Sequence, residues 1–327
     1  MKYLIVGDVQ AKKENLGKVR QLLDIVEHQE HNVVWLGDLL DRRGHIEAEV
    51  LNLFYDYFSH SRHQHNVIVG NHDLLGVHSE VTALQPLKAL ENVAIIDEPH
   101  YLRGDGPISS ILMVPYYRNP QKFLAAINDP SNEPKPMTLI CHQGVKEFTI
   151  GSGYTEDDAV AMEDLAQFDL VIAGHYHTPK GCGNITYLGS PFSHSFGESN
   201  EEKRIGILDT ATNTLEYIRT DFPRHLTFER TLPLKEPIEV RYYGDEQTKT
   251  TLDYYRFIIS GNDKDLKTFR GEVAPIFPVV KFIYKSLGGE AAIIGENMTN
   301  ADKWIKWAKE IKKLDQDTIN VGLELLK

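Results

Sequence analysis

Six side chains of the kinds that ligate transition metals lie at or just after short apolar runs. They are Asp8, Asp38, Asn71, His142, His175 and His177. Carboxylate oxygens, amide oxygens and imidazole nitrogens are donors that manganese, iron and zinc accept. Asp38 is the candidate for a bridge between two ions, while His175 and His177 stand two apart on one extended segment and therefore point the same way. The set predicts a centre that holds two divalent metal ions.

The elements that must position these ligands are five short strands. Apolar runs rich in β-branched residues precede the ligands at 3–6, 33–36, 67–69, 137–141 and 170–173. Nearly continuous apolar runs of this length are typical of strands covered on both faces. Helices are predicted between them at 15–27, 47–58 and 156–167. The fold class is therefore α/β, and the sites of such layered proteins gather beyond the carboxyl ends of the strands.

The rest of the chain predicts a closing sheet and a second domain. Short strands with tight turns, at 185–188, 204–208 and 215–219, indicate a second, more antiparallel sheet. The composition changes near 234–237, so we expect residues 1–234 to form the catalytic domain and residues 235–327 a small α+β domain. In that small domain we predict strands at 238–243, 255–259 and 279–284 and a helix at 301–314.

The composition is that of a globular protein and restricts where the protein works. Hydrophobic residues make up 41% of the chain and charged residues 25%, as in soluble domains. No run approaches the ~20 apolar residues that cross a bilayer. The two cysteines, Cys141 and Cys182, form neither a disulfide framework nor a zinc spacing. We therefore expect a cytoplasmic protein in a reducing compartment, with no membrane partner.

The formal net charge of −12 is unevenly distributed. Residues 1–234 hold 20 Lys and Arg against 32 Asp and Glu, whereas residues 235–327 hold 15 of each. Such acidity normally argues against a nucleic-acid surface. Carboxylates that hold divalent cations produce the same imbalance, because the cations neutralise them. Charge alone therefore leaves a nucleic acid open as a substrate.

Two further clusters each leave two interpretations open. His60, His63 and His65 could form another metal site, but they lie between a predicted helix and a strand, where a solvated loop is the simpler interpretation. Residues 303–313 place five lysines on a predicted helix that also carries an apolar stripe. A core-packed helix with a solvated basic face is favoured there, with phosphate contact as the alternative.

Taken in order, the ligand motifs resemble those of the calcineurin-like metallophosphoesterase superfamily. They are Gly7-Asp8-Val-Gln10, Gly37-Asp38-Leu-Leu-Asp41-Arg42, Gly70-Asn71-His72-Asp73, His142 and Gly174-His175-Tyr-His177. Within this superfamily, three later segments resemble the SbcD/Mre nuclease subunit of double-strand-break repair. Those segments are Tyr187-Leu-Gly-Ser190-Pro, Phe196-Gly-Glu198 and Asn200-Glu201-Glu202-Lys203. The resemblance covers about residues 1–230, and phage-encoded relatives of this nuclease are similarly short.

The resemblance implies a four-layer α-β-β-α sandwich of two β-sheets, followed by a small capping domain. It implies exonuclease and endonuclease activity on DNA that depends on two divalent ions, manganese before Mg²⁺, Fe²⁺ or Zn²⁺. It also implies a homodimer that assembles with an SbcC-like ABC-type ATPase in a recombination and repair complex, inside a bacterial cell and of bacterial or phage origin. For the lysine-rich helix at 303–313, docking on that ATPase is then a further alternative.

The resemblance also assigns the ligands to two ions. The first ion falls to Asp8, Gln10, Asp38 and His177. The second ion falls to Asp38, Asn71, His142 and His175. Gln10 departs from the family, which usually has histidine there. An amide oxygen is a weaker donor than imidazole for the softer first-row metals, so we expect the first ion to bind more weakly.

Four neighbouring residues receive roles in the same way. His72 matches the catalytic histidine beside the metals. Asp41 matches an acid that orients this histidine in the protein phosphatases of the superfamily, and Arg42 matches their phosphate contact. His194 lies near the metal loops as a candidate substrate contact.

Two rival functions remain open. A protein or nucleotide phosphomonoesterase is supported by the segment Gly37-Asp38-Leu-Leu-Asp41-Arg42-Arg43-Gly44. A binding scaffold that has lost catalysis would be favoured by wholesale loss of ligands, and only Gln10 points that way.

Overall fold

The computed structural model describes residues 1–103, 110–129, 137–148, 158–241, 253–277 and 279–287. The chain divides into two compact units, Met1–Leu226 and Thr227–Lys327. The predicted division at 234 stays a prediction. Within the described residues, no helix has the length and apolar character needed to span a bilayer.

The first sheet carries the N-terminal ligands. Its six strands lie in the order β12-β11-β1-β2-β3-β4. Their bounds are β1 (Lys2–Val6), β2 (Asn32–Trp35), β3 (His65–Ile68), β4 (Val93–Ile96), β11 (Arg204–Asp209) and β12 (Thr214–Arg219). Strands β1 to β4 are parallel to one another, and β11 is antiparallel to β1. The connections contain α1 (Leu16–Glu27) and α2 (Ala48–His60), with the short turns η1 (Lys13–Asn15) and η2 (Gln85–Ala89).

The second sheet carries the histidine ligands. Its strand order is β5-β6-β7-β8-β10-β9. Their bounds are β5 (His100–Arg103), β6 (Ser110–Val114), β7 (Thr138–His142), β8 (Leu170–Gly174), β9 (Lys180–Cys182) and β10 (Ile185–Tyr187). Strands β6, β7, β8 and β10 are parallel, so β7 and β8 end at the same edge. Helix α3 (Pro120–Ile127) follows β6, and η4 (Phe196–Glu198) follows β10.

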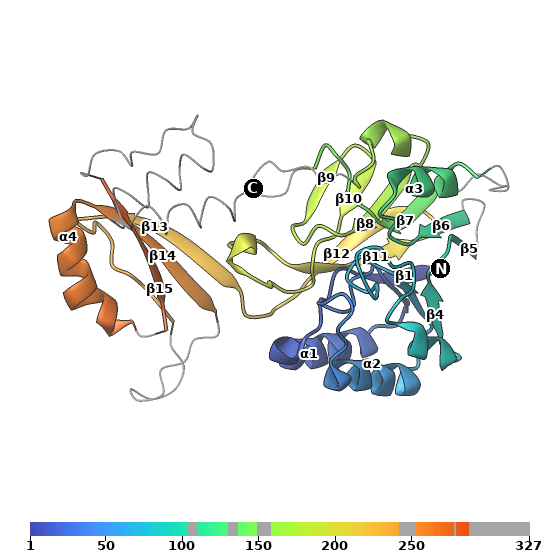
Figure 1. Cartoon of the computed structure of the whole chain (residues 1–327), viewed down its shortest axis with the longest axis horizontal. Coiled ribbons are helices and arrows are strands. Elements are labelled where there is room, and N and C mark those ends of the chain that lie inside the picture. The colour runs from blue at the N-terminus through green and yellow to red at the C-terminus, as the bar shows by residue number, and fades with distance from the viewer. Residues whose placement is uncertain (104–109, 130–136, 149–157, 242–252, 278, 288–327) are drawn as a thin grey trace, which may run out of the picture. The chain divides into compact units, whose positions relative to one another are not determined.

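The two sheets pack face to face, and helices cover their outer faces. Along β1, Leu4 belongs to the cluster that contains α1 and α2 side chains, whereas its neighbour Ile5 belongs to a cluster shared with Ile140 and Ile172 of the second sheet. This alternation is the period of a strand buried on both faces. Helix α3 packs on the outer face of the second sheet through Phe123. Figure 1 shows α1 and α2 beside the first sheet and α3 beside the second. The predicted four-layer sandwich is confirmed.

Two sequence-based expectations about this unit were wrong. The helix predicted at 156–167 is, where the structure describes it, only a short 3-10 turn, η3 (Met162–Leu165). The strands after position 184 do not build a sheet of their own. Strand β10 pairs with β8 of the second sheet, and β11 with β1 of the first. Each existing sheet offers an open edge with unpaired backbone groups, and pairing with these strands covers it.

The second unit contains a three-stranded sheet in the order β13-β14-β15, whose first strand begins two residues before the unit boundary. Its elements are β13 (His225–Thr231), β14 (Tyr254–Gly261), α4 (Asp263–Thr268), η5 (Phe269–Val273), η6 (Ala274–Ile276) and β15 (Lys281–Ser286). The strands predicted at 255–259 and 279–284 correspond to β14 and β15. The strand predicted at 238–243 is wrong over 238–241, which is irregular, and continues outside the described residues. The helix predicted at 301–314 and the lysines of 303–313 also lie outside them.

Candidate metal centre

Five of the predicted ligands, Asp8, Asp38, Asn71, His142 and His175, meet where the carboxyl ends of the two sheets lie together. Asp8 and Asp38 follow β1 and β2, Asn71 follows β3, and His142 is the last residue of β7. Oxygen or nitrogen atoms of Asp8, Asp38 and His142 all lie within 4.8 Å of one another, and all three residues are buried. Buried carboxylates beside an imidazole are a donor set suited to a divalent cation.

The glycines before the ligands create the space that this convergence needs. A Cβ on Gly70 would lie 2.3 Å from both the backbone N and Oδ1 of Asp38. A Cβ on Gly37 would lie 2.4 Å from Nδ1 of His142, and Gly37 also has φ of +104°. Real Cβ atoms do not approach other atoms so closely. The Gly-ligand dipeptides are therefore required by packing at the centre as well as by turn geometry.

Three predicted ligands have a strained backbone. Gln10 has φ of +43°, Asp38 of +49° and His175 of +98°. Non-glycine residues rarely occupy the left-handed region, and such conformations cluster at functional sites. Among the described residues only Asn200 and Asn213 are other non-glycine examples, and asparagine tolerates this region. The strain therefore concentrates at the predicted ligands.

The histidine nitrogens predicted to bind the second ion converge on the amide oxygen of Asn71. Nε2 of His142 and Nδ1 of His175 each lie 2.9 Å from Oδ1 of Asn71. Nδ1 of His142 lies 2.8 Å from the carbonyl of Leu36, to which it donates. Because Nδ1 of His142 carries the proton, Nε2 of the same ring presents a lone pair to the lone pairs of Asn71 Oδ1. A cation bound by both atoms would relieve the repulsion between them. Burial lowers the pKa of His142, which keeps the ring a neutral donor.

Asp8 offers a buried oxygen for the first predicted ion. Its Oδ1 accepts a hydrogen bond from the backbone N–H of His175 at 2.8 Å. Its Oδ2 is buried, and among the described residues no group hydrogen-bonds to it. A buried carboxylate oxygen without a partner is costly. A bound cation removes that cost, so Asp8 fits the predicted ligand role.

Asp38 lies between the two predicted ions. Its Oδ1 accepts the backbone N–H of His72 at 2.7 Å and lies 3.5 Å from Nε2 of His142. Burial alone would raise the pKa of Asp38, but the imidazoles of His142 and His72 outweigh it and hold the pKa below its ordinary value. Gln10, which is also buried, donates its backbone N–H to the Asp38 carbonyl at 2.8 Å. The backbone of Gln10 is thus fixed beside Asp38, the candidate bridging ligand.

His177 is held by charged residues that we did not predict. Its Nδ1 lies 3.1 Å from Oε1 of Glu198. The other oxygen of Glu198 accepts a hydrogen bond from Nζ of the buried Lys203 at 2.7 Å. Burial would raise the pKa of Glu198, but the hydrogen bond from His177 and the charge of Lys203 lower it to about 2. The sequence showed Glu198 and Lys203 only as letters of a family motif, without this connection.

His72 is oriented by the backbone of Asp41. Nδ1 of His72 lies 2.5 Å from the carbonyl oxygen of Asp41 and therefore carries the proton, which leaves Nε2 for a substrate. The carboxylate of Asp41 instead accepts a hydrogen bond from Nζ of Lys12 at 2.9 Å. The exposed Arg42 lies 3.7 Å from that carboxylate. The orienting contact thus comes from the main chain of Asp41, and the predicted roles of these residues remain predictions.

Two further side chains that we did not predict hold the metal loops. Asp73 is buried and accepts the backbone N–H of Leu40 at 3.0 Å and that of Gly70 at 2.9 Å. Nε of Arg43 donates to the Asn71 carbonyl at 2.7 Å. Both contacts join the loop after β2 to the loop after β3. Such positions can be suspected from sequence only by their nearness to ligands.

His194 lies at the same edge as the first predicted ion. Its Nε2 is 3.3 Å from the carbonyl of Asp8, and its ring centroid is 5.0 Å from that of His177. Burial and the neighbouring His177 lower the pKa of His194 to about 3, so the ring is neutral. The structure therefore places His194 beside the centre, and its contact with substrate stays a prediction.

The other histidine cluster is explained by packing. His65 is buried, accepts a hydrogen bond from the indole N–H of Trp35 at 3.2 Å, and lies 2.9 Å from Oγ of Ser61. Nε2 of His63 lies 3.3 Å from the carbonyl of Glu27. Within the described residues the three rings of His60, His63 and His65 do not gather as a ligand set. The solvated-loop interpretation was also incomplete, because two of the three rings are buried.

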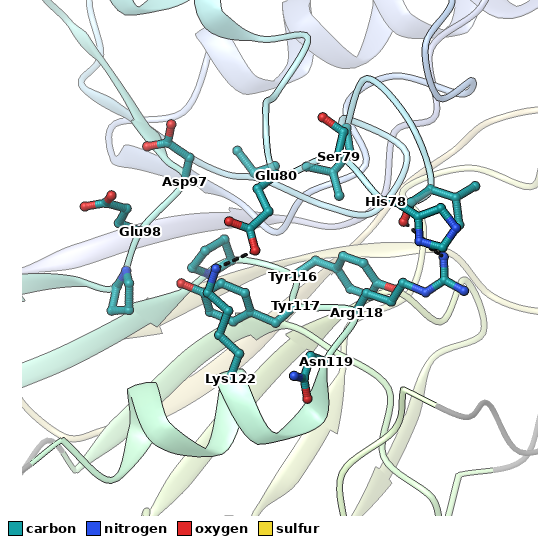
Figure 2. A pocket seen from close by; sticks show the side chains of 15 residues that line it. His78, Ser79, Glu80, Asp97, Glu98, Tyr116, Tyr117, Arg118, Asn119 and Lys122 are labelled. Atoms are coloured by element: carbon teal, nitrogen blue, oxygen red, sulfur yellow. Dashed lines mark hydrogen bonds and ion pairs between the residues drawn. The ribbon is translucent and has the colours of Figure 1, made fainter.

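A cavity of about 590 Å³ borders the metal centre. Tyr116 forms the wall between them, since its ring centroid lies 6.1 Å from that of His175 and 6.2 Å from that of His142. Figure 2 shows Arg118 toward one end of this cavity and Asp97 and Glu98 toward the other. Ligand pockets are commonly ~300–1,000 Å³. The cavity is therefore large enough for a small ligand, and Tyr116 separates it from the metal histidines.

The chain is similar to several known proteins. The chain is 25% identical over 224 residues to exonuclease subunit 1 of Enterobacteria phage T4, a match of 67% of this chain to 61% of that protein. It is 27% identical to the putative phosphoesterase 078R of Invertebrate iridescent virus 3, over 79% of this chain and 76% of that one. The solved structure of an archaeal phosphodiesterase covers 67% of this chain and 99% of its own, at 16% identity and a TM-score of 0.37. Residues 1–179, more than half of the chain, match the calcineurin-like phosphoesterase family. The chain belongs to this family of metal-dependent hydrolases of phosphate esters.

Proposed function

We propose that this protein is a two-metal-dependent DNA nuclease that hydrolyses phosphodiester bonds. The observation that carries the metal dependence is the buried convergence of Asp8, Asp38 and His142, with one Asp8 oxygen that has no partner among the described residues. The similarity to a phage exonuclease subunit supports DNA as the substrate. This chain spans about three fifths of that relative's length.

The residues of the centre fit hydrolysis without a covalent intermediate. Two bound divalent ions, manganese before magnesium, iron or zinc, would supply activation of water and stabilisation of the attacking and leaving oxygens. His72 is fixed through Nδ1 at the Asp41 carbonyl, so its protonated ring can donate from Nε2 to the departing oxygen. Asp38 accepts the backbone N–H of His72. That hydrogen bond fixes the acid beside the bridging carboxylate.

The cavity beside the metals supports a diester. A phosphate within a strand carries groups on both sides, so its substrate needs room next to the ligands. Tyr116 lines the cavity, and its ring lies 6.1 Å from that of His175, centroid to centroid. Nη1 of Arg118 donates to the Val77 carbonyl at 3.2 Å and lies 3.2 Å from Nδ1 of His78, and among the described carboxylates none forms an ion pair with Arg118. Its guanidinium is therefore available to a neighbouring phosphate of the strand.

The phosphomonoesterase alternative is weaker on the same geometry. In the phosphatases the acid that matches Asp41 orients the catalytic histidine, whereas here the Asp41 carboxylate is held by Lys12. Arg42, the counterpart of the phosphatase phosphate contact, is exposed and lies against Asp41. A scaffold without catalysis is weaker still, because the donor groups converge and His72 is fixed beside them.

The proposal extends to a partner. The phage relative is named as a subunit, and we propose that this chain acts as a homodimer with an SbcC-like ABC-type ATPase in recombination and repair. Co-purification of the chain with a candidate ATPase, followed by molecular-mass measurement of the complex, tests this part. A chain that stays monomeric and unbound at micromolar concentration would contradict it.

Incubation with three substrates tests the activity. Labelled linear duplex, labelled single-stranded DNA and p-nitrophenyl phosphate are each supplied with manganese, magnesium or a chelator. We expect manganese to support cleavage of DNA, with little turnover of p-nitrophenyl phosphate and none in chelator. Turnover of p-nitrophenyl phosphate without DNA cleavage would establish the phosphomonoesterase instead.

A further inference from the structure

Two of the three metal histidines, His142 and His177, are held by different kinds of acceptor. His142 donates through Nδ1 to a neutral backbone carbonyl, that of Leu36, at 2.8 Å. His177 has its Nδ1 at 3.1 Å from a carboxylate oxygen of Glu198. A carboxylate on the far nitrogen makes the near nitrogen a stronger donor and fixes the ring, and loss of such a partner typically weakens metal affinity by ~10–100-fold. The stronger support is thus on the side of the first predicted ion.

That side is also the one that contains Gln10. The family resemblance gives the first ion to a set that includes both Gln10 and His177, and the amide of Gln10 replaces an imidazole. We propose that Glu198, held by Lys203, is a positioning residue that strengthens His177 as a ligand at the site where Gln10 is the weaker donor. The proposal rests on the two-metal site of the proposed function.

Glu198 is built as a fixed anion. Its Oε2 accepts hydrogen bonds from Nζ of Lys203 at 2.7 Å and from Oγ of Ser190 at 3.2 Å, and Oε1 remains for His177. Glu198 is 7% exposed and Lys203 is 3% exposed. A buried ion pair with further hydrogen bonds keeps its geometry, because breaking either partner leaves a buried charge. The carboxylate therefore cannot turn away from the imidazole at low cost.

Lys203 holds His177 at a second point. Its Nζ donates to the backbone carbonyl of His177 at 2.9 Å, and the backbone N–H of Ser190 donates to the same carbonyl at 3.0 Å. The ring is thus fixed through Glu198 and the main chain through Lys203 and Ser190. This double attachment sets the direction of Nε2. A buried ion pair that served only the core would not need to hold the same histidine at both ends.

Glu201 provides a matched control. Its Oε2 lies 3.2 Å from Nζ of Lys203, and its Oε1 accepts a hydrogen bond from Oγ1 of Thr178 at 2.8 Å. It is therefore a second carboxylate on the same lysine, but the structure records no hydrogen bond between it and the ring of His177 in the described part of the chain. Loss of its charge tests the ion-pair network without removing the acceptor of the histidine.

Manganese binding, measured by calorimetric titration in the absence of DNA, tests the proposal. The proteins are wild type, Glu198→Gln, Glu201→Gln, Gln10→His and the double variant Glu198→Gln with Gln10→His. We expect Glu198→Gln to weaken the weaker of two sites by ~10–100-fold and to leave the tighter site unchanged. Glu201→Gln should match wild type, and Gln10→His should restore part of the affinity that Glu198→Gln loses.

Thermal unfolding of each metal-free variant measures the loss of general stability that accompanies the substitution. Equal affinities in wild type and Glu198→Gln would overturn the proposal, as would an equal loss of affinity at both sites, whatever the change in unfolding temperature. Wild type that binds fewer than two ions would overturn the two-metal site itself, and with it this proposal. That result depends on wild type alone, so the two failures are distinguishable.

Discussion

The two halves of the metal centre are held by different parts of the fold. On the side of the second ion, His142 ends a central strand of one sheet and donates to the main chain that follows β2 in the other. On the side of the first ion, His177 lies in a loop and depends on Glu198 and Lys203, which follow β10 and precede β11. The comparison indicates that His142 is fixed by a strand and a main-chain acceptor, whereas His177 depends on a buried ion pair. Substitutions should therefore affect the halves differently.

The largest effect is expected at Asp38, the predicted ligand that both halves share. Asp38→Ala removes the bridging candidate, so both ions should be lost and DNA cleavage should fall at least ~10³-fold, toward the level in chelator. Bound manganese and cleavage are measured on the same preparation. Retention of two ions by this variant would show that Asp38 does not join the halves.

His72→Ala should lose turnover without losing either half. General acid catalysis is typically worth ~10²–10⁴-fold, and His72 contacts the centre through its backbone N–H, which the substitution keeps. Metal content should therefore match wild type while the cleavage rate falls within that range. A metal-free variant would make His72 a ligand instead.

Lys203→Met should lower the free energy of unfolding and also weaken the site of the first ion. The substitution leaves Glu198 as a buried anion without its lysine, and removal of one partner of a buried pair typically costs about 3–5 kcal/mol. Urea unfolding of the metal-free protein measures this cost. A loss below about 1 kcal/mol would mean that the pair contributes little to the folded state.

The pH dependence of the unfolding free energy should show the contribution of ionised Glu198. Its pKa is lowered to about 2 in the folded protein, from an ordinary value of 4.5. A lowered folded pKa contributes stability above the unfolded pKa and loses it as the pH falls toward the folded one. The difference in unfolding free energy between wild type and Glu198→Gln should thus be on the order of 3 kcal/mol near neutral pH and shrink below about pH 4.5. A difference that stays constant down to about pH 3 would contradict this assignment.

The smallest effect is expected from Gln10→His, which replaces the amide ligand of the first ion with an imidazole. An imidazole at this position should lower the manganese concentration for half-maximal cleavage by about tenfold and leave the tighter site unchanged. The buried backbone of residue 10 is fixed by Asp38 and by Asn15, whose Nδ2 donates to the Gln10 carbonyl at 3.0 Å. An unchanged manganese requirement would show that the amide is already an adequate ligand.

Sequence predicted the framework well because its signals are local. Continuous apolar runs before Asp8 and His142 correspond to β1 and β7, since strands buried on both faces leave that pattern. Sequence failed where the answer depends on tertiary pairing. The strands after position 184 have no local signal that selects the edge of β1 or of β8, and the apolar residues near 156–167 did not specify a helix.

The candidate site shows the same division. The Gly-ligand dipeptides could be found because each lies at the end of a strand. The roles of Glu198, Lys203 and Asp73 could not be found, because each acts through hydrogen bonds to groups on other loops. Conversely, His63 and His65 are close in sequence but are satisfied by Glu27, Ser61 and Trp35. Nearness along the chain is therefore weaker evidence for a site than a common sheet edge.

A manganese titration that records bound metal and DNA cleavage together tests the central claim most directly. The account predicts that wild type binds two ions with unequal affinity and that cleavage follows occupancy of the weaker one, because in-line displacement needs the bridged pair. Cleavage that saturates when only the tighter site is filled, or that persists undiminished in chelator, would contradict the two-metal mechanism.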